Sequence, residues 1–275
     1  MTIQDVINKI IAYHPPLGER EATTCDTVKI GDTSAECTGV VTAIYASVEI
    51  IKKAIEAGCN LIVVHEPSFY THMDPFDWLE GNEVFEEKKQ LCLDNGIVIF
   101  RDHDRIHSHR PDGIFYGMAC ELGWQDKAVF DWMAPPDRSN PVGRTFEFDG
   151  VPVLEIGKQL MEALNLKNLR IIGNRDTKVY RLAFGGHLFP GKNDIINAVD
   201  KEKIDCLIPL EMIDWEVPGY FKDAAALGMN KACLQIGHYN GEELGMKWAV
   251  NWIKELVEDK IPVIYICNED LYDYI

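Results

Sequence analysis

The sequence predicts an α/β fold with mainly parallel sheets. Apolar runs too short to be helices alternate along the chain with amphipathic helical patterns. The loops between these elements are short, as in repeated β-α-β units. Polar residues follow several of the apolar runs directly, as where Leu61-Ile62-Val63-Val64 leads into His65-Glu66. Because ligands of open α/β folds bind outside the carboxyl ends of the strands, these ends are the first places to look for a site.

In the first part of the chain the alternation is regular. The first predicted helix covers residues 2–12, with Thr2 as its N-cap. Its apolar residues recur at helical spacing: Ile3, Val6, Ile7, Ile10 and Ile11. The elements predicted after it are strand 40–45, helix 47–57 capped by Ser47, strand 61–64, charged surface helix 83–95, strand 97–101 and helix 114–122.

The pattern weakens over 126–144, where the proline-rich stretch 134–141 predicts an exposed loop or linker. The alternation then resumes. The elements predicted here are helix 155–164, strands 168–172 and 178–184, helix 192–201, strand 205–208, helix 218–227, strand 231–236, helix 241–259 and strand 263–267.

Composition excludes several classes of partner. The formal net charge is −17 and the pI about 4.8, so nucleic acid and anionic membrane surfaces are poor partners for this chain. None of the eight cysteines forms a C-x-x-C pair, and most lie in apolar segments, which predicts reduced core thiols and a cytoplasmic protein. We expect no signal peptide, and no apolar run reaches the ~18 residues that a membrane-spanning helix needs.

The first candidate site is His65-Glu66, at the end of strand 61–64. Pro67 excludes the helical conformation at the residue before it, so the chain turns here and both side chains could face one site. The alternative is a histidine and an acid exposed in a loop.

The second candidate site is the segment 101–110, which follows strand 97–101. It holds three histidines, His103, His107 and His109, together with Asp102 and Asp104. Imidazoles and carboxylates together suit zinc, iron or manganese. The alternative is a solvated polar loop, but the position of this segment level with His65 favours a metal site.

The third candidate site is His238 with Glu242. Asn240 and Glu243 resemble a capping box, which predicts that the helix starts near Gly241 and that His238 lies in the entry loop. Both side chains could then reach one ion. The alternative assigns Glu242 to the favourable position of an acid in the first turn of a helix.

Two further residues have open roles. His187 follows a strand end and the turn Gly185-Gly186, where a structural histidine explains it equally well. Glu211 follows another strand and could instead cap the next helix. Walker and Gly-x-Gly-x-x-Gly spacings and the Gly-x-Ser-x-Gly elbow are absent from the sequence.

Taken in order, these segments resemble the Nif3-like, or dinuclear metal centre hexameric, protein family, some of whose members are described as homologues of a type 2 GTP cyclohydrolase I. The resemblance begins with Asp26-Thr27-Val28-Lys29-Ile30-Gly31, where the family has an Asp-x-x-Gly-Leu-x-x-Gly-like segment. It continues through 56–67, where the family has a His-His-Pro motif, through 103–113, similar to its His-Thr-Asn-Leu-Asp segment, and through 237–242, similar to its Gly-His…Glu motif.

The resemblance implies a ligand set with two departures. Glu66 stands where the family has its second histidine, and His107 stands where it has aspartate. An imidazole and a carboxylate have thus exchanged positions, so the total stays at three imidazoles and two carboxylates. The implied metal ligands are His65, Glu66, His107, His238 and Glu242. Asp104 or His103 could replace a ligand in the same loop.

The resemblance also implies an architecture. Two similar α/β lobes would surround a central metal-binding cleft, the first formed by 1–125 plus 235–275 and the second by 126–234. Members of the family form homohexamers.

The first functional hypothesis is a metal-dependent hydrolase acting on a small molecule such as a nucleotide. Two divalent ions (zinc, iron or manganese) would activate a water, with Glu242 as a candidate bridge and His103 or His187 as general acid or base. The second hypothesis is a non-catalytic metal-binding or regulatory hexamer. A third is a member whose altered ligands no longer bind metal.

Overall fold

The computed structural model describes residues 1–137, 139–189, 191, 194–273 and 275. The chain divides into two compact units, the first formed by Met1–Met118 and Gly245–Asn268, and the second by Ala119–Leu244 and Glu269–Ile275. Two helices cross the division, namely α5 (Gly113–Leu122) and α9 (His238–Leu256). Each unit contains one five-stranded sheet, and the strands are mainly parallel, as predicted: three of the four neighbouring pairs are parallel in the first sheet and two of four in the second.

The sheet of the first unit has the strand order β1-β4-β3-β2-β12. Only β1 runs antiparallel to its neighbour. The bounds of its strands are β1 Val28–Ile30, β2 Val40–Ala43, β3 Leu61–Val64, β4 Val98–Arg101 and β12 Val263–Tyr265. All residues of β2, β3 and β4 are buried, which explains why these strands are continuous apolar runs in the sequence.

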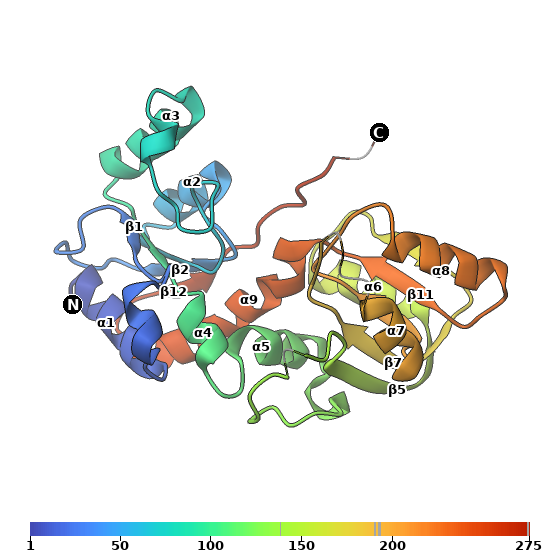
Figure 1. Ribbon diagram of the computed structural model, residues 1–275. Coiled ribbons are helices and arrows are strands. Elements are labelled where there is room, and N and C mark those ends of the chain that lie inside the picture. The colour runs from blue at the N-terminus through green and yellow to red at the C-terminus, as the bar shows by residue number, and fades with distance from the viewer. Residues whose placement is uncertain (138, 190, 192–193, 274) are drawn as a thin grey trace. The chain divides into compact units, whose positions relative to one another are not determined.

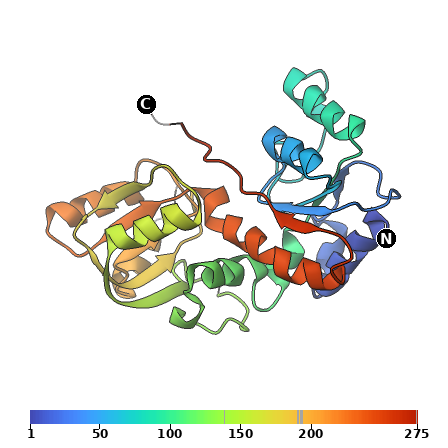
Figure 2. The same ribbon diagram turned by 180° about the vertical axis from the view of Figure 1, so that it is seen from behind.

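Helices cover both faces of this sheet. On one face lie α2 (Val48–Glu56) and α3 (Glu83–Asp94), and on the other lies α1 (Ile3–Tyr13) (Figures 1 and 2). Thr2 caps α1 in a full capping box with Asp5, as the sequence predicted for the N-cap. Ser47 accepts a hydrogen bond from the Ile50 amide and caps α2.

One prediction for α3 is wrong in part. The helix was expected to be a charged surface helix, yet Lys88 is buried together with the apolar residues Phe85 and Cys92. The Lys88 ammonium donates to the Ser68 carbonyl and lies 5.0 Å from the centroid of the Phe69 ring. The remaining helical segments of this unit are short: η1 Gly18–Ala22, η2 Asp77–Leu79 and α4 Asp104–Ser108.

The sheet of the second unit has the strand order β5-β7-β9-β11-β6, with the two edge strands β5 and β6 antiparallel to their neighbours. Its strands are β5 Arg144–Pro152, β6 Arg170–Gly173, β7 Lys178–Phe184, β9 Cys206–Ile208 and β11 Ala232–Gln235. The strand β5 had not been predicted. Its alternation of buried and exposed residues is interrupted by the register shift between Glu147 and Val151, which obscures its period.

A separate two-stranded parallel sheet pairs β8 (His187–Leu188) with β10 (Glu211–Met212). The other helical elements of the second unit are η3 Gln125–Lys127, α6 Val153–Ala163, α7 Asp194–Lys201 and α8 Val217–Ala226. Residues 192–193 of the predicted helix 192–201, and residue 138 of the predicted loop, lie outside the described residues.

Two general predictions bear on the core and on membranes. Six of the eight cysteines are buried, as expected for core thiols. Within the described part of the chain, no helix has both the length and the apolar character needed to span a membrane.

Candidate metal centre

The first group of candidate ligands lies at the carboxyl ends of β3 and β4. These strands are parallel neighbours in which Val64 pairs with Arg101, so the residues that follow them emerge at the same edge of the sheet. His65-Glu66 continues from β3, and Asp102-His103 continues from β4. The short helix α4 then brings His107 back toward the same place, because residues four apart lie on one face of a helix.

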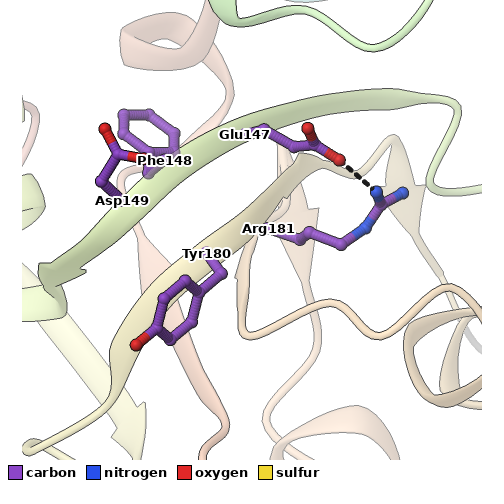
Figure 3. A pocket seen from close by; sticks show the side chains of 5 residues that line it. All are labelled: Glu147, Phe148, Asp149, Tyr180 and Arg181. Carbon is purple, nitrogen blue, oxygen red and sulfur yellow. Dashed lines mark hydrogen bonds and ion pairs between the residues drawn. The ribbon is translucent and has the colours of Figure 1, made fainter.

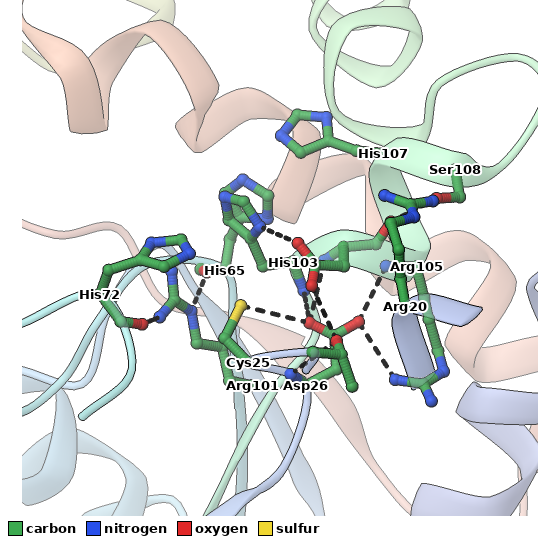
Figure 4. Close-up of polar contacts among 12 residues, drawn as sticks. Arg20, Cys25, Asp26, His65, His72, Arg101, His103, Arg105, His107 and Ser108 are labelled. Carbon is green, nitrogen blue, oxygen red and sulfur yellow. Dashed lines mark hydrogen bonds and ion pairs between the residues drawn. The ribbon is translucent and has the colours of Figure 1, made fainter. Parts of the chain in front are cut away.

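The structure brings three imidazoles together at this edge. His65, His103 and His107 each offer one ring nitrogen, and the three nitrogens lie within 4.8 Å of one another. The His65 ring is 4.5 Å from that of His103 and 4.8 Å from that of His107, measured between centroids. Figure 4 shows the three rings side by side above the end of the sheet. Of the predicted site residues, His65, His103 and His107 thus form one cluster.

Each of these histidines is held through Nδ1 by an oxygen. The His65 Nδ1 lies 3.1 Å from the carbonyl oxygen of Asp102. Because a carbonyl only accepts, Nδ1 of His65 carries the proton and the ring's basic lone pair is on Nε2. A carboxylate oxygen of Asp112 lies 3.1 Å from Nδ1 of His107. A carboxylate oxygen of Asp104 lies 3.0 Å from Nδ1 of His103. All three contacts therefore favour the tautomer that presents Nε2 as a metal ligand.

Glu66 joins the same cluster. It is buried, and its Oε1 lies 3.8 Å from Nε2 of His65 and 3.9 Å from Nε2 of His103. Its other oxygen is 3.8 Å from the guanidinium of the buried residue Arg101. Arg101 also donates to the carbonyl oxygens of His65 and His72, which fixes the turn after β3.

Burial affects the charge state of His103. Desolvation, with the neighbouring His65 as a smaller cause, lowers the pKa of His103 to about 4. The ring is therefore neutral at neutral pH, which is the form that coordinates metal. The hydrogen bond from His103 in turn holds the pKa of Asp104 well below its usual range.

The second group of candidate ligands lies in the second unit. Here α9 begins at His238, so the prediction of a helix start near Gly241 was wrong. Gly237, with φ +88°, makes the turn from β11, and the Asn240 side chain donates to the Ile236 carbonyl instead of capping the helix. His238 and Glu242 consequently lie one helical turn apart, with His238 Nε2 3.1 Å from Glu242 Oε2.

Glu211 connects two histidines of this second group. Its Oε1 is 2.5 Å from Nδ1 of His238, and its other oxygen contacts Nδ1 of His187. Burial alone would raise the pKa of Glu211, but the hydrogen bonds from the two imidazoles outweigh it and lower this pKa to about 2. Glu211 therefore stays a carboxylate beside Nδ1 of His238, while Nε2 of the same ring faces the Glu242 carboxylate.

Some contacts of the candidate ligands were not predicted. Asp112, which orients His107, lies just before α5 and also accepts from the Ile114 amide, so its sequence signal is that of a helix cap. Glu211 does not cap a helix; it lies on β10 beside His187 of β8. His109 is placed with His14 instead of the cluster, at 3.3 Å between their Nδ1 atoms, and His14 Nε2 is 3.0 Å from the buried carboxylate of Asp102.

A shallow pocket in the second unit contains none of these residues. It lies on β5 and β7 and is lined by Glu147, Phe148, Asp149, Tyr180 and Arg181 (Figure 3). Glu147 and Arg181 form an ion pair of 2.7 Å across it. The candidate ligands therefore lie at strand and helix ends, outside this pocket.

The class of protein is thus an α/β protein of two units. Each unit carries a cluster of histidines and carboxylates, a candidate metal site, at the ends of its strands and helices. The family model of Duf34/NIF3 (NGG1p interacting factor 3) matches residues 1–270, and the chain belongs to this family. This confirms the resemblance seen in the sequence motifs.

Relatives and solved structures agree with this assignment. A GTP cyclohydrolase 1 type 2 homolog of Clostridium perfringens is 25% identical over 267 residues, which are 96% of this chain and 95% of the relative. Another, from Clostridium acetobutylicum, is 23% identical over 88% of this chain and 85% of the relative. The crystal structure of a Bacillus cereus protein related to NIF3 superposes with a TM-score of 0.70 at 14% identity, covering 100% of this chain and 99% of the other. The last comparison confirms the fold.

Proposed function

We propose that this protein is a metal-dependent hydrolase of a small molecule, with divalent metal ions held by its histidine and carboxylate clusters. The observation that carries the proposal is the shared arrangement of the histidines. His65, His103 and His107 are each held by an oxygen at Nδ1 and gather with the carboxylate of Glu66. Such outer contacts orient imidazoles and raise their basicity in metal sites.

The donor atoms fit a divalent transition metal. Neutral imidazole nitrogens and carboxylate oxygens suit zinc, iron and manganese, and no thiolate ligand is required. His65, Glu66 and His107 would hold metal in the first unit, and His238 and Glu242 in the second. That these five residues form one dinuclear centre stays a prediction.

The residues around these ligands have separable roles. A bound divalent ion would supply Lewis-acid chemistry and lower the pKa of a water molecule. Arg101 fixes the Glu66 carboxylate, and Glu211 orients His238. His187 is half exposed and donates from Nδ1 to Glu211, so its Nε2 is available to accept a proton as a general base. His103 lies in the imidazole cluster itself, with its Nε2 placed as a metal ligand, so the role of base is assigned to His187.

The relatives suggest where to look for the substrate. Because the curated relatives are named GTP cyclohydrolase 1 type 2 homologs, nucleotides are the first substrates to test. We also propose a cytoplasmic homohexamer, in line with the family resemblance and with the reduced core thiols that the sequence predicts.

The test is metal-dependent turnover. Protein reconstituted with zinc, iron(II) or manganese is assayed against nucleotides including GTP, phosphate esters and cyclic amides. We expect turnover by the wild type that chelation removes and that His238→Ala abolishes. His109→Ala is the matched control, since His109 contacts His14 and not the cluster, and should stay active. A protein that binds metal but turns over no substrate would instead be a non-catalytic metal-binding scaffold.

A further inference from the structure

The carboxylate of Asp26 makes an unusual set of contacts with the segment that carries the candidate ligands. Its side chain is fully buried. Oδ1 accepts from the backbone amides of His103 at 2.8 Å and Asp104 at 2.9 Å, and Oδ2 accepts from the amide of Arg105 at 2.8 Å. Oδ2 also accepts from Nη1 of Arg105 at 3.3 Å. Figure 4 shows this carboxylate beneath the start of α4.

These contacts replace a missing helix cap. The first amides of a helix have no partner within the helix, and they are usually satisfied by the side chain of the N-cap residue. The N-cap of α4 is His103, whose side chain makes no capping hydrogen bond. Asp26, which lies far away in the sequence, supplies the acceptors in its place, and its negative charge is favourable at a helix N-terminus.

The geometry of the candidate ligands depends on this cap. A helix as short as α4 is not stable by itself, since its formation must be supported by outside contacts. The amide of His103 is fixed directly by Asp26, and the amide of His107 donates to the His103 carbonyl at 3.2 Å. Without the cap, the distance between the imidazoles of His103 and His107 would therefore no longer be fixed.

We propose that Asp26 is a positioning residue of the metal site, which sets the places of His103 and His107 through the N-terminus of α4. The proposal rests on the proposed function in that it requires metal to bind at this cluster. Asp26 itself does not touch the metal; it acts through the backbone.

Neighbouring contacts make a clean comparison available. Glu21 also contacts Arg105, but only through the guanidinium, and its side chain is partly exposed. Thr24 donates to the Asp104 carboxylate at 2.8 Å, and Arg20 donates to Ser108 at 2.8 Å. These contacts reach side chains of α4 and not its first backbone amides. Glu21→Gln is therefore the matched control, because it removes a carboxylate from Arg105 and leaves the His103 amide capped.

The test compares wild type, Asp26→Asn and Glu21→Gln as full chains. Cobalt(II) affinity is measured by competition with a chelator, the visible spectrum of the cobalt complex reports ligand geometry, and amide exchange at 103–108 is followed in metal-free protein. We expect Asp26→Asn to weaken cobalt binding by about 10–100-fold, to change the spectrum and to speed exchange. Glu21→Gln should stay within about twofold of wild type.

Two results would overturn the proposal. If Asp26→Asn binds cobalt like wild type with an unchanged spectrum, Asp26 is only a structural cap, even if exchange is faster. If wild type binds no cobalt, the proposed function fails as well, and faster exchange in Asp26→Asn would then show a cap that serves the fold alone.

Discussion

At the scale of single residues, the candidate site is defined by the oxygen atoms that contact Nδ1 of each imidazole. The sequence shows that histidines follow strand ends, but the oxygen that holds Nδ1 is not visible there. For His65 it is a backbone carbonyl, which any residue could supply, and for His238 it is Glu211, which is distant in the sequence. Residue types could therefore be predicted as ligands, whereas tautomers and orientation could not.

Lys88 is a second feature that only the structure reveals. The helical pattern of α3 predicts a solvated face, but Lys88 turns inward over the Phe69 ring. Burial lowers the pKa of Lys88 to about 8, because the charged ammonium loses hydration.

The buried ammonium predicts a pH dependence of stability. Below pH 8 Lys88 is charged in both the folded and the unfolded state, and the cost of burial is present in full. Between pH 8 and the unfolded pKa of about 10.4, the unfolded state binds more protons, so stability rises with pH. We expect the free energy of unfolding of wild type, minus that of Lys88→Met, to increase by on the order of 1–3 kcal/mol from pH 7 to pH 10.

Denaturant unfolding of the two proteins across this range measures the difference, in which the titrations of groups that do not interact with Lys88 cancel. Parallel stability curves would mean that Lys88 is hydrated in solution.

At the scale of elements, most helices and strands were predicted to within a few residues. The strong signals were apolar runs for β3 and β4, and helical periodicity with a capping residue for α1 and α2. Weak signals failed for physical reasons. The edge strand β5 has a register shift, and the short helix α4 has no capping side chain at its own N-cap and is contacted by Thr24 and Asp26 instead.

Close packing between α9 and α5 predicts a sharp difference between two glycines. A Cβ at Gly245 would lie 2.6 Å from Cα and 2.7 Å from the carbonyl oxygen of Ile114, so the two helices could not keep their present approach. We expect Gly245→Ala to lower the free energy of unfolding by about 1–3 kcal/mol.

The control is Gly219 in α8, where a Cβ would meet nothing within 4 Å. Gly219→Ala should leave stability unchanged or raise it by up to about 1 kcal/mol, because alanine favours helix. Thermal or denaturant unfolding separates the two variants, and equal effects would contradict the packing argument.

At the scale of the whole molecule, the family and the fold followed from the order of short motifs along the chain. The match to the Duf34/NIF3 family over residues 1–270 confirms the family. The ligand set was less predictable, because Glu66 and His107 depart from the motifs. The structure places both beside His65, and the exchange of an imidazole and a carboxylate between the two positions stays a prediction.

The most direct test of the central claim, that these clusters hold metal, is elemental analysis of the purified protein. Wild type, Glu66→Ala, His107→Ala and His109→Ala are compared after reconstitution with zinc, iron and manganese. We predict about two ions per chain in wild type and in His109→Ala, as in two-metal sites, and fewer in the other two variants. No ion above background in any of the proteins would contradict it and leave a scaffold that has lost its metal.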